Sequence, residues 1–318
     1  MGEGVMEAIR CSGLSKRYGG TAAVDGLDLS VSAGQVYGFL GPNGAGKTTT
    51  LRMLLGLIRP TGGRAWVNGR RLPDPDGLAR VGAVIEEPAF HSWMTGRRSL
   101  EALAWCGPPL PHAAAVSSAL DRTGLASVAD HKVKTYSQGM RQRLALALAL
   151  MRAPSVVLLD EPMNGLDPAG VREFRISLRA LADSGTTVLV SSHQMAEVEQ
   201  LCDRVGVIKN GRMVAEGRPQ DLTTAVARVV LAPPDLEAAR ELLARYFTVS
   251  REGPATLLVQ DGDGRAVNEM LGRSGMWAHQ IRVERSGLEH VFLELTREAS
   301  HTERRTGVEG DGDATAAG

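Results

Sequence analysis

A glycine-rich stretch near the N-terminus carries the clearest chemical signal in the sequence. Residues 41–48 read GPNGAGKT and fit the pattern G-x-x-x-x-G-K-S/T, with Gly41, Gly46, Lys47 and Thr48 at the fixed places. The glycines let backbone N–H groups curl around phosphate oxygens, the lysine supplies a positive charge to the β- and γ-phosphates, and the threonine can bind Mg²⁺. This stretch therefore predicts a nucleotide phosphate site.

Two adjacent acids supply the second half of such a site. Asp160 and Glu161 come directly after the apolar run VVLL, and ligands of α/β sheets bind beyond the carboxyl ends of the strands. Asp160 is expected to hold Mg²⁺, directly or through water, and Glu161 can polarise the water that attacks the γ-phosphate. Paired acids by themselves could be a solvated strand end, and their place after a phosphate loop favours the chemical role.

The hydrophobic pattern predicts the sheet that must hold these groups. Apolar strands precede the glycine-rich loop and the paired acids, a third apolar run precedes His193, and helical patterns separate them. Near-continuous apolar strands that alternate with helices indicate an α/β fold with a mostly parallel sheet, covered on both faces. Asn210 and Gly211 predict the turn of a two-stranded hairpin.

Length and composition limit the class of protein. The 318 residues leave room for two domains, and Lys plus Arg and Asp plus Glu number 36 each, so no net charge attracts nucleic acid. The longest apolar run, from Leu144 to Met151, is too short for a membrane helix of about 20 residues, and the N-terminus lacks the apolar core of a signal peptide. The sequence therefore predicts a soluble, cytoplasmic chain. Cys11, Cys106 and Cys202 are too widely separated for a metal-ligand pattern and are expected to be reduced.

The order of these patterns predicts three segments. Residues 1–222 are expected to form the nucleotide-binding domain, which includes a helical subdomain at about 88–153. Residues 225–298 alternate between strand and helix patterns and predict a small C-terminal α+β accessory domain of ferredoxin-like type. Residues 299–318 have almost nothing to bury and are expected to be a disordered tail.

Further motifs follow in a fixed order, namely YSQGMRQR at 136–143, DEPMNGLD at 160–167 and SSH at 191–193. The Asn-Lys-x-Asp segment of guanine-reading proteins does not occur. Together with the phosphate loop, these motifs give residues 5–220 a strong resemblance to the ATP-binding subunit of an ABC transporter. The resemblance implies a P-loop NTPase fold with a helical signature subdomain, the cofactors ATP and Mg²⁺, and a dimer of two such subunits.

The resemblance also implies roles for single residues. Glu161 would be the catalytic acid, His193 the switch histidine that contacts the γ-phosphate, and Thr48 and Asp160 the groups that hold the metal. Tyr18 matches the aromatic residue that stacks on adenine, with an ordinary tyrosine in a turn as the alternative. The phosphate loop, the signature loop and the loop that faces the other subunit comprise Gly41, Pro42, Asn43, Gly44, Ala45, Gly46, Lys47, Thr48 and Thr49; Ser137, Gln138 and Gly139; and Asn164, Gly165, Leu166 and Asp167.

The signature loop accounts for the apolar run that follows it. In this family it caps a helix, here expected to start near Gln138, whose free N–H groups and positive dipole end face the γ-phosphate of ATP held by the other subunit. Gly139 allows close approach of the backbone, and Ser137 can donate a hydrogen bond. The apolar tail of this helix is expected to lie in the protein core.

Two motifs depart from the common family pattern. The signature usually reads Leu-Ser-Gly-Gly-Gln, whereas residues 136–140 read Tyr-Ser-Gln-Gly-Met and keep the serine and the second glycine. Glu86 stands where the family usually has a glutamine, so its contact with the metal is left open. Both features, with the C-terminal stretch GLEHVFLEL, resemble the ATPases of drug, bacitracin and lantibiotic export systems.

Two functions are compatible with this resemblance. The first is a peripheral subunit at the cytoplasmic face of the membrane, whose homodimer powers a separate permease, with export of a drug or antibiotic expected. The second is a soluble ABC-type ATPase that acts on nucleic acid or ribosomes. Such proteins usually carry two cassettes or a long coiled coil, and a single cassette without long heptads favours transport with no nucleic-acid partner.

Phe90 and Trp93 are candidate contacts for the permease, or else pack inside the helical subdomain. The identity of the cargo depends on the permease.

Overall fold

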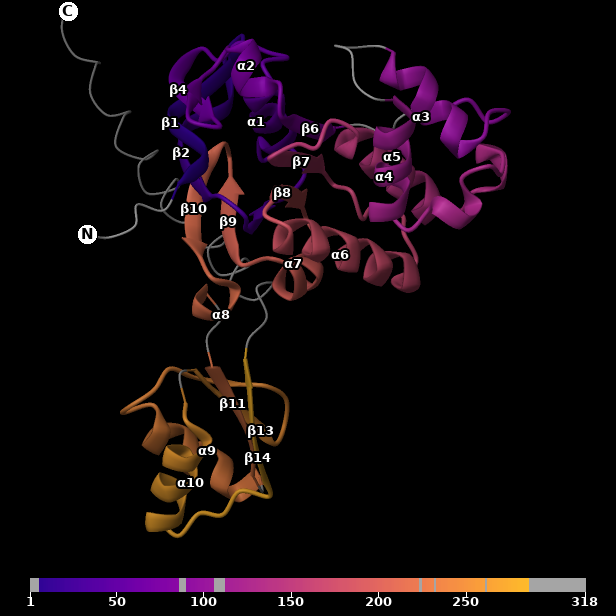
Figure 1. The fold of residues 1–318 in the computed structure, drawn as a ribbon. Helices are drawn as coiled ribbons and strands as arrows, with labels where there is room; N and C mark the ends of the chain where they lie inside the picture. The colour runs from indigo at the N-terminus through magenta and orange to yellow at the C-terminus, as the bar shows by residue number, and fades with distance from the viewer. Residues whose placement is uncertain are drawn as a thin grey trace, which may run out of the picture. The chain divides into compact units, whose positions relative to one another are not determined.

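The chain divides into two compact units, Met1–Arg218 and Pro219–Gly318. Figure 1 shows the first unit as sheets flanked by helices and the second as a smaller sheet with helices against it. The computed structural model describes residues 6–85, 90–105, 112–222, 225–231, 233–260 and 262–285.

The first unit is built on a six-stranded sheet of order β10-β9-β3-β8-β7-β6. Neighbouring strands run parallel except for the β9–β10 pair. Strands β3, β7 and β8 are buried along almost their whole length, as expected when helices cover both faces of a parallel sheet. The predicted α/β fold with a mostly parallel sheet is confirmed. The strands are β3 (Val36–Leu40), β6 (Val81–Val84), β7 (Val156–Asp160), β8 (Thr187–Ser192), β9 (Arg204–Lys209) and β10 (Arg212–Gly217).

The hairpin of β9 and β10 turns at the predicted dipeptide. Asn210 and Gly211 have φ angles of 50° and 79°, the left-handed conformation that a two-residue type I′ turn requires at both central residues. The Gly211 N–H donates to the Ala45 carbonyl at 3.0 Å. The hairpin turn is therefore tied directly to the glycine-rich loop.

A four-stranded antiparallel sheet of order β2-β1-β4-β5 forms another layer of the first unit. The sequence pattern does not predict its two long strands, because register shifts, such as the one between Cys11 and Leu14, interrupt the alternation. Ile9, Leu27 and Phe39 show that this sheet and the central sheet share one hydrophobic core. The strands are β1 (Glu7–Tyr18), β2 (Thr21–Ser32), β4 (Gly62–Val67) and β5 (Arg70–Arg71).

Helices flank the central sheet and form a helical segment beside it (Figure 1). In that segment α5 (Gln138–Leu150) begins at the predicted residue, and Leu144 and Leu146 of its apolar tail are fully buried in the protein. No helix in the described part of the chain is long and apolar enough to cross a membrane. The other helices described in this unit are α1 (Lys47–Leu54), α2 (Pro75–Leu78), α3 (Gly96–Ala104), α4 (His112–Arg122), α6 (Pro168–Asp183) and α7 (Met195–Leu201), with 3-10 turns η1 (Ala126–Val128) and η2 (Val133–Thr135).

The second unit is a four-stranded antiparallel sheet of order β12-β13-β11-β14. Its order of elements along the chain, strand-helix-strand-strand-helix-strand, is that of a ferredoxin-like domain. Val229, Leu257 and Leu271 are fully buried in a core that belongs to this unit alone. The stretches 286–298 and 299–318 lie outside the described residues. The elements are α8 (Pro219–Leu222), β11 (Ala225–Val230), α9 (Pro233–Leu243), β12 (Val249–Arg251), β13 (Thr256–Gln260), α10 (Gly264–Arg273) and β14 (Gln280–Arg285).

The separate core of the second unit leads to a prediction about truncation. We expect a chain that ends after Leu222 to fold and to bind ATP with the affinity of the full chain, because a unit with its own core does not depend on the other for packing. Isothermal titration with ATP checks the affinity, and a cooperative thermal transition checks the fold. A folded truncated chain that binds no ATP would contradict this expectation.

Candidate active site

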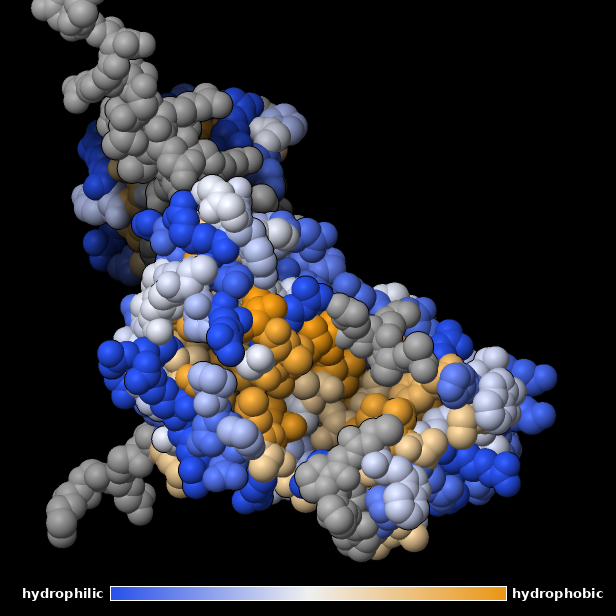
Figure 2. All heavy atoms as spheres, turned by 90° about the horizontal axis from the view of Figure 1, so that it is seen from above, coloured by the Kyte–Doolittle hydropathy of each residue, from blue (hydrophilic) through white to orange (hydrophobic). Residues whose placement is uncertain are grey.

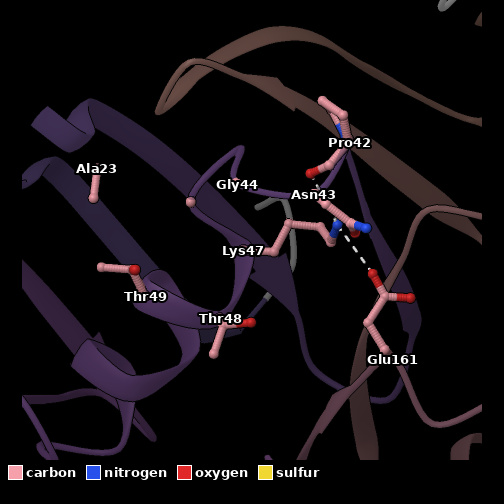
Figure 3. Close-up of a pocket in the computed structure, with 9 residues that line it drawn as sticks. Ala23, Pro42, Asn43, Gly44, Lys47, Thr48, Thr49 and Glu161 are labelled. Carbon is pink, nitrogen blue, oxygen red and sulfur yellow. Dashed lines mark hydrogen bonds and ion pairs between the residues drawn. The ribbon is translucent and has the colours of Figure 1, made fainter.

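The glycine-rich loop joins the end of β3 to the start of α1 and leaves a pocket of about 180 Å³ beside Glu161. A Cβ atom at Gly41 would lie 2.5 Å from the Ile208 carbonyl oxygen, and one at Gly46 would lie 2.4 Å from the Ala23 carbonyl oxygen. Both glycines are therefore required by close backbone packing. Figure 3 shows the pocket, which is lined by Ala23, Pro42, Asn43, Gly44, Gly46, Lys47, Thr48, Thr49 and Glu161.

Lys47 is a buried cation at the floor of this pocket, with 5% of its side chain exposed. Its Nζ donates to the carbonyl oxygens of Gly41 at 2.7 Å and Pro42 at 3.2 Å. The Glu161 Oε1 atom lies 3.0 Å from the same nitrogen. A buried ammonium group needs anionic or carbonyl partners to offset its lost hydration. The loop thus holds a positive charge where phosphate oxygens can reach it.

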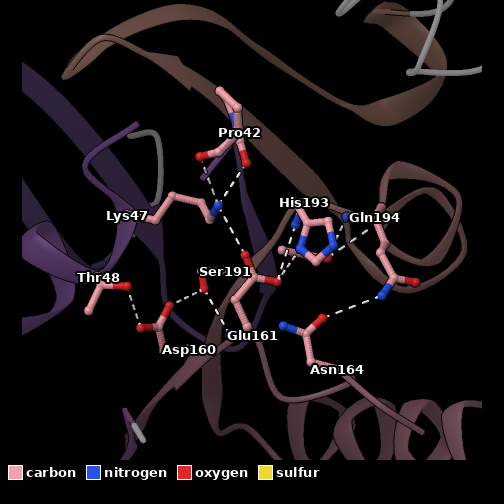
Figure 4. A network of polar contacts seen from close by, with 11 residues as sticks. Pro42, Lys47, Thr48, Asp160, Glu161, Asn164, Ser191, His193 and Gln194 are labelled. Atoms are coloured by element: carbon pink, nitrogen blue, oxygen red, sulfur yellow. Dashed lines mark hydrogen bonds and ion pairs between the residues drawn. The ribbon is translucent and has the colours of Figure 1, made fainter. Parts of the chain in front are cut away.

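Asp160 lies between two hydroxyl groups at the end of β7. The Thr48 hydroxyl donates to Asp160 Oδ2 at 2.6 Å, and the Ser191 hydroxyl donates to Oδ1 at 2.5 Å (Figure 4). Hydroxyl and carboxylate oxygens are the ligand atoms that Mg²⁺ prefers. Magnesium sites commonly use one or two carboxylates together with phosphate oxygens and water. The residues at this point therefore fit the predicted metal.

Glu161 connects the lysine to the predicted switch histidine. Its Oε2 atom lies 2.9 Å from His193 Nδ1 and accepts from the His193 backbone N–H at 3.3 Å. Together with the Lys47 contact, these bonds fix both carboxylate oxygens (Figure 4). The side chain is 19% exposed, so a carboxylate that faces the pocket is largely shielded from bulk water. Such a group can accept a proton from a water bound in the pocket.

The signature residues lie at the N-terminus of α5, away from this pocket. Ser137 caps the helix, since its Oγ accepts from the Met140 N–H at 3.2 Å. Gln138 reaches the neighbouring loop, where its Nε2 donates to the Asn164 carbonyl at 3.4 Å. Ser137, Gln138 and Asn164 are exposed, and Asp167 caps α6 by accepting from Gly170 N–H at 2.8 Å. The two predicted interface loops are thus adjacent and open to solvent.

Gly139 of the signature loop is not closely packed by other atoms of its own subunit. A Cβ atom at Gly139 would meet nothing closer than Gly170 Cα at 3.8 Å, an ordinary contact. The φ angle there is not in the left-handed region that favours glycine. A methyl group at this position would therefore meet no close contact within the subunit.

Some predicted residues are not brought into the pocket. Tyr18 is 52% exposed at the end of β1 and does not line the cavity; its ring lies beneath the Lys16 amine, 5.1 Å from the ring centroid. Glu86 lies outside the described residues, as does Cys106. Cys11 and Cys202 are buried and free, and burial raises the pKa of the Cys11 thiol to about 12.

The structure adds two contacts that the sequence reasoning missed. Ser191 donates to Asp160, and Gln194 Nε2 donates to the Asn164 side chain at 3.4 Å. The available signal was the pair of serines before His193, because small hydroxyl residues at the end of a parallel strand point toward the ligand edge of the sheet.

The first unit also exposes apolar surface. Figure 2 shows apolar residues gathered in a hollow on the face it presents, bordered by hydrophilic residues. Trp93 is 67% exposed and stacks on His91 with ring centroids 5.5 Å apart, whereas Phe90 is half-buried. Exposed apolar surface of this kind is typical of a site for a partner protein.

Comparisons with known proteins agree on one family. The family described as ABC transporter matches residues 24–164. The chain is 39% identical to the daunorubicin/doxorubicin resistance ATP-binding protein DrrA of Streptomyces peucetius, over 91% of this chain and 92% of the relative. It is 35% identical to the bacitracin transport ATP-binding protein BcrA of Bacillus licheniformis, over 90% and 96%. A solved structure, the ADP conformation of the ATP-binding cassette MJ1267 of an ABC transporter, shares 25% identity with a TM-score of 0.62 and covers 68% of this chain and 92% of that one.

Proposed function

The chain belongs to the family of ABC transporter ATP-binding proteins, and on that premise we propose that two copies of it bind ATP between them and power a separate membrane permease. Its activity is ATP hydrolysis coupled to transport. The observation that carries the proposal is that Lys47, Thr48 and Glu161 line one pocket at the phosphate loop, while the Thr48 hydroxyl is bonded to Asp160. A charge for phosphate, a metal ligand and a proton acceptor are the groups that phosphoryl transfer to water needs.

In this proposal the phosphate loop and Lys47 bind the nucleotide. Lys47 Nζ now donates to the carbonyl oxygens of Gly41 at 2.7 Å and Pro42 at 3.2 Å. When ATP binds, its β- and γ-phosphate oxygens would accept these hydrogen bonds instead. The N–H groups at the start of α1 point toward the same place and favour an anion. Thr48 and Asp160 would hold Mg²⁺, which when bound neutralises charge on the phosphates.

Glu161 and His193 carry the hydrolytic step in this proposal. The Glu161 carboxylate orients a water molecule toward the γ-phosphate and accepts its proton. The imidazole of His193, 2.9 Å from the same carboxylate, would hold that side chain in place and contact the γ-phosphate. Release of Glu161 from the lysine, once phosphate binds there, frees one carboxylate oxygen for the water.

The second copy supplies what the pocket lacks. The N-terminus of α5, with Ser137 and Gly139, is the end of the helix that favours an anion, and neither residue lines the phosphate pocket of its own chain. We therefore place it against the γ-phosphate held by the other copy. The loop from Asn164 to Asp167 lies next to it and would face the same interface.

The relatives support a proposal for the transport partner and the class of cargo. Both named relatives concern drug resistance or antibiotic transport, which supports export of a drug or antibiotic over action on nucleic acid or ribosomes. The exposed Trp93 supports a docking face for a permease, so the working position would be the cytoplasmic surface of the membrane. Co-purification of a membrane protein with the tagged chain tests this, and Trp93→Ala should weaken that association without changing ATP binding.

Replacement of the buried lysine tests nucleotide binding. We expect Lys47→Ala to weaken ATP affinity about ten- to hundredfold, because a charge-assisted hydrogen bond to phosphate contributes about 1.5–3 kcal/mol. Equilibrium binding of a fluorescent ATP analogue measures the change. Lys132→Ala removes an exposed lysine outside the pocket and serves as the control. Unaltered ATP affinity in the Lys47→Ala protein would count against the phosphate-loop assignment.

A further inference from the structure

Ser191 is a buried serine that contacts both acids of the site. It lies in β8, with no exposed surface, and pairs in register with Asp160 of the neighbouring strand β7. Its hydroxyl donates to Asp160 Oδ1 at 2.5 Å and accepts from the Glu161 backbone N–H at 2.9 Å (Figure 4). A serine hydroxyl has one hydrogen to donate and lone pairs to accept. Its donor and one acceptor site are therefore both directed at consecutive residues of the acid pair.

The bond to the Glu161 N–H acts at a point of unusual backbone. Glu161 has a φ angle of 47°, in the left-handed region, where a residue with a side chain is less stable by roughly 1–2 kcal/mol. Such a conformation persists only when surrounding contacts fix it. The Ser191 oxygen is one such contact, and it fixes the direction in which the Glu161 side chain leaves the strand.

The bond to Asp160 differs from the one that Thr48 makes. Thr48 also donates to this carboxylate, at 2.6 Å, but it is itself a proposed metal ligand. Ser191 lies in β8, donates to the other oxygen of the Asp160 carboxylate and has no proposed metal contact. It is therefore the contact that can keep the carboxylate in orientation whether or not the metal is bound.

We propose that Ser191 is the positioning residue of the acid pair: one hydroxyl orients the Asp160 carboxylate for the metal and holds the Glu161 backbone in its left-handed turn. The proposal rests on the roles proposed above for Asp160 and Glu161. It goes further in making their geometry depend on β8, the same strand that leads into His193. The acid pair and the switch histidine are thus held by one strand end.

The test compares Ser191→Ala with Ser191→Thr in the full chain. Mn²⁺ binding is followed by electron paramagnetic resonance with a non-hydrolysable ATP analogue, and nucleotide binding is measured separately in EDTA. We expect Ser191→Ala to weaken Mn²⁺ binding and to lower kcat, each by about 10- to 100-fold, as loss of a contact behind a metal ligand typically does. Nucleotide affinity in EDTA should not change, because Lys47 and the phosphate loop are intact. Ser191→Thr keeps the hydroxyl and should restore both values.

Two control variants separate the role of Ser191 from the roles proposed for Asp160 and Glu161. Ser99→Ala removes another buried serine hydroxyl, which bonds to the Thr95 carbonyl at 2.9 Å in α3, and should leave Mn²⁺ binding unchanged. If Ser191→Ala matches the wild-type protein in Mn²⁺ affinity and kcat while Glu161→Gln is inactive, only the role of Ser191 is refuted. If Glu161→Gln is also active, the proposed site itself fails.

A second measurement covers the case in which the threonine protein does not fold. The Glu161 amide, bonded to Ser191 Oγ, should be protected from hydrogen exchange in the wild-type protein. In the Ser191→Ala protein that amide should exchange faster, while amides in the interior of α5 keep their rates. An unchanged exchange rate at Glu161 would overturn the proposal.

Discussion

Glu161→Gln is expected to keep ATP binding and to lose nearly all hydrolysis. An amide of the same shape can still lie beside Lys47 and His193, but it cannot accept the proton of the attacking water. Removing a general base of this kind lowers a rate by about 10²- to 10⁴-fold. Phosphate release under saturating ATP measures the loss, and binding of a fluorescent ATP analogue shows that the site remains intact.

The same substitution should change the assembly state. A pair of subunits that closes on ATP and cannot hydrolyse it has no route to reopen by turnover, so an ATP-bound dimer should accumulate. Glu7→Gln is the matched control, because Glu7 is bonded to Ser30 in the β2-β1-β4-β5 sheet, here called the outer sheet, and lies far along the chain from the acids. Turnover of the Glu161→Gln protein within a few-fold of wild type would show that another group accepts the proton.

Gly139→Asp is expected to abolish dimerisation and hydrolysis while each copy still binds ATP. The substitution would place a carboxylate against the γ-phosphate held by the other copy, and two unit charges about 4 Å apart repel by about 4 kcal/mol at an effective dielectric of 20. That energy lowers an association constant by about a thousandfold. Within its own subunit a Cβ at Gly139 would make only ordinary contacts, the nearest with Gly170 Cα at 3.8 Å.

Two control variants show whether the effect of Gly139→Asp is specific to its charge and its position. Gly62→Asp introduces the same charge in β4, where a Cβ would meet Ser15 at 3.7 Å, and it should still dimerise with ATP. Gly139→Ala adds a methyl group without charge and separates steric from electrostatic effects. If Gly139→Asp binds no ATP, the loss lies in folding or in the subunit's own pocket rather than at the interface.

The sequence predicted those features that local chemistry fixes. The type I′ turn at Asn210 and Gly211 follows from two residues that tolerate positive φ. The start of α5 near Gln138 was expected from the family resemblance, and the structure shows that Ser137 caps it. The buried strands of the central sheet follow from near-continuous apolar runs such as VVLL, which are typical of strands covered on both faces.

The features that the sequence did not predict depend on pairing between distant segments. The outer sheet contains β1 and β2, whose alternation is interrupted by register shifts. The bond between Ser191 and Asp160 joins residues 31 positions apart and depends on the register of β7 with β8. No pattern within either strand sets that register. Tyr18 is exposed at the end of β1, and its stacking on adenine stays a prediction.

A second copy of this chain is expected to complete each ATP site. The most direct test is the mass of the protein in solution, by size exclusion with light scattering, in the Glu161→Gln background with and without ATP. We expect a monomer that becomes a dimer when ATP is added, and a protein with both Glu161→Gln and Gly139→Asp that binds ATP yet stays monomeric. If the doubly substituted protein still forms an ATP-dependent dimer, the signature loop does not face the partner's γ-phosphate.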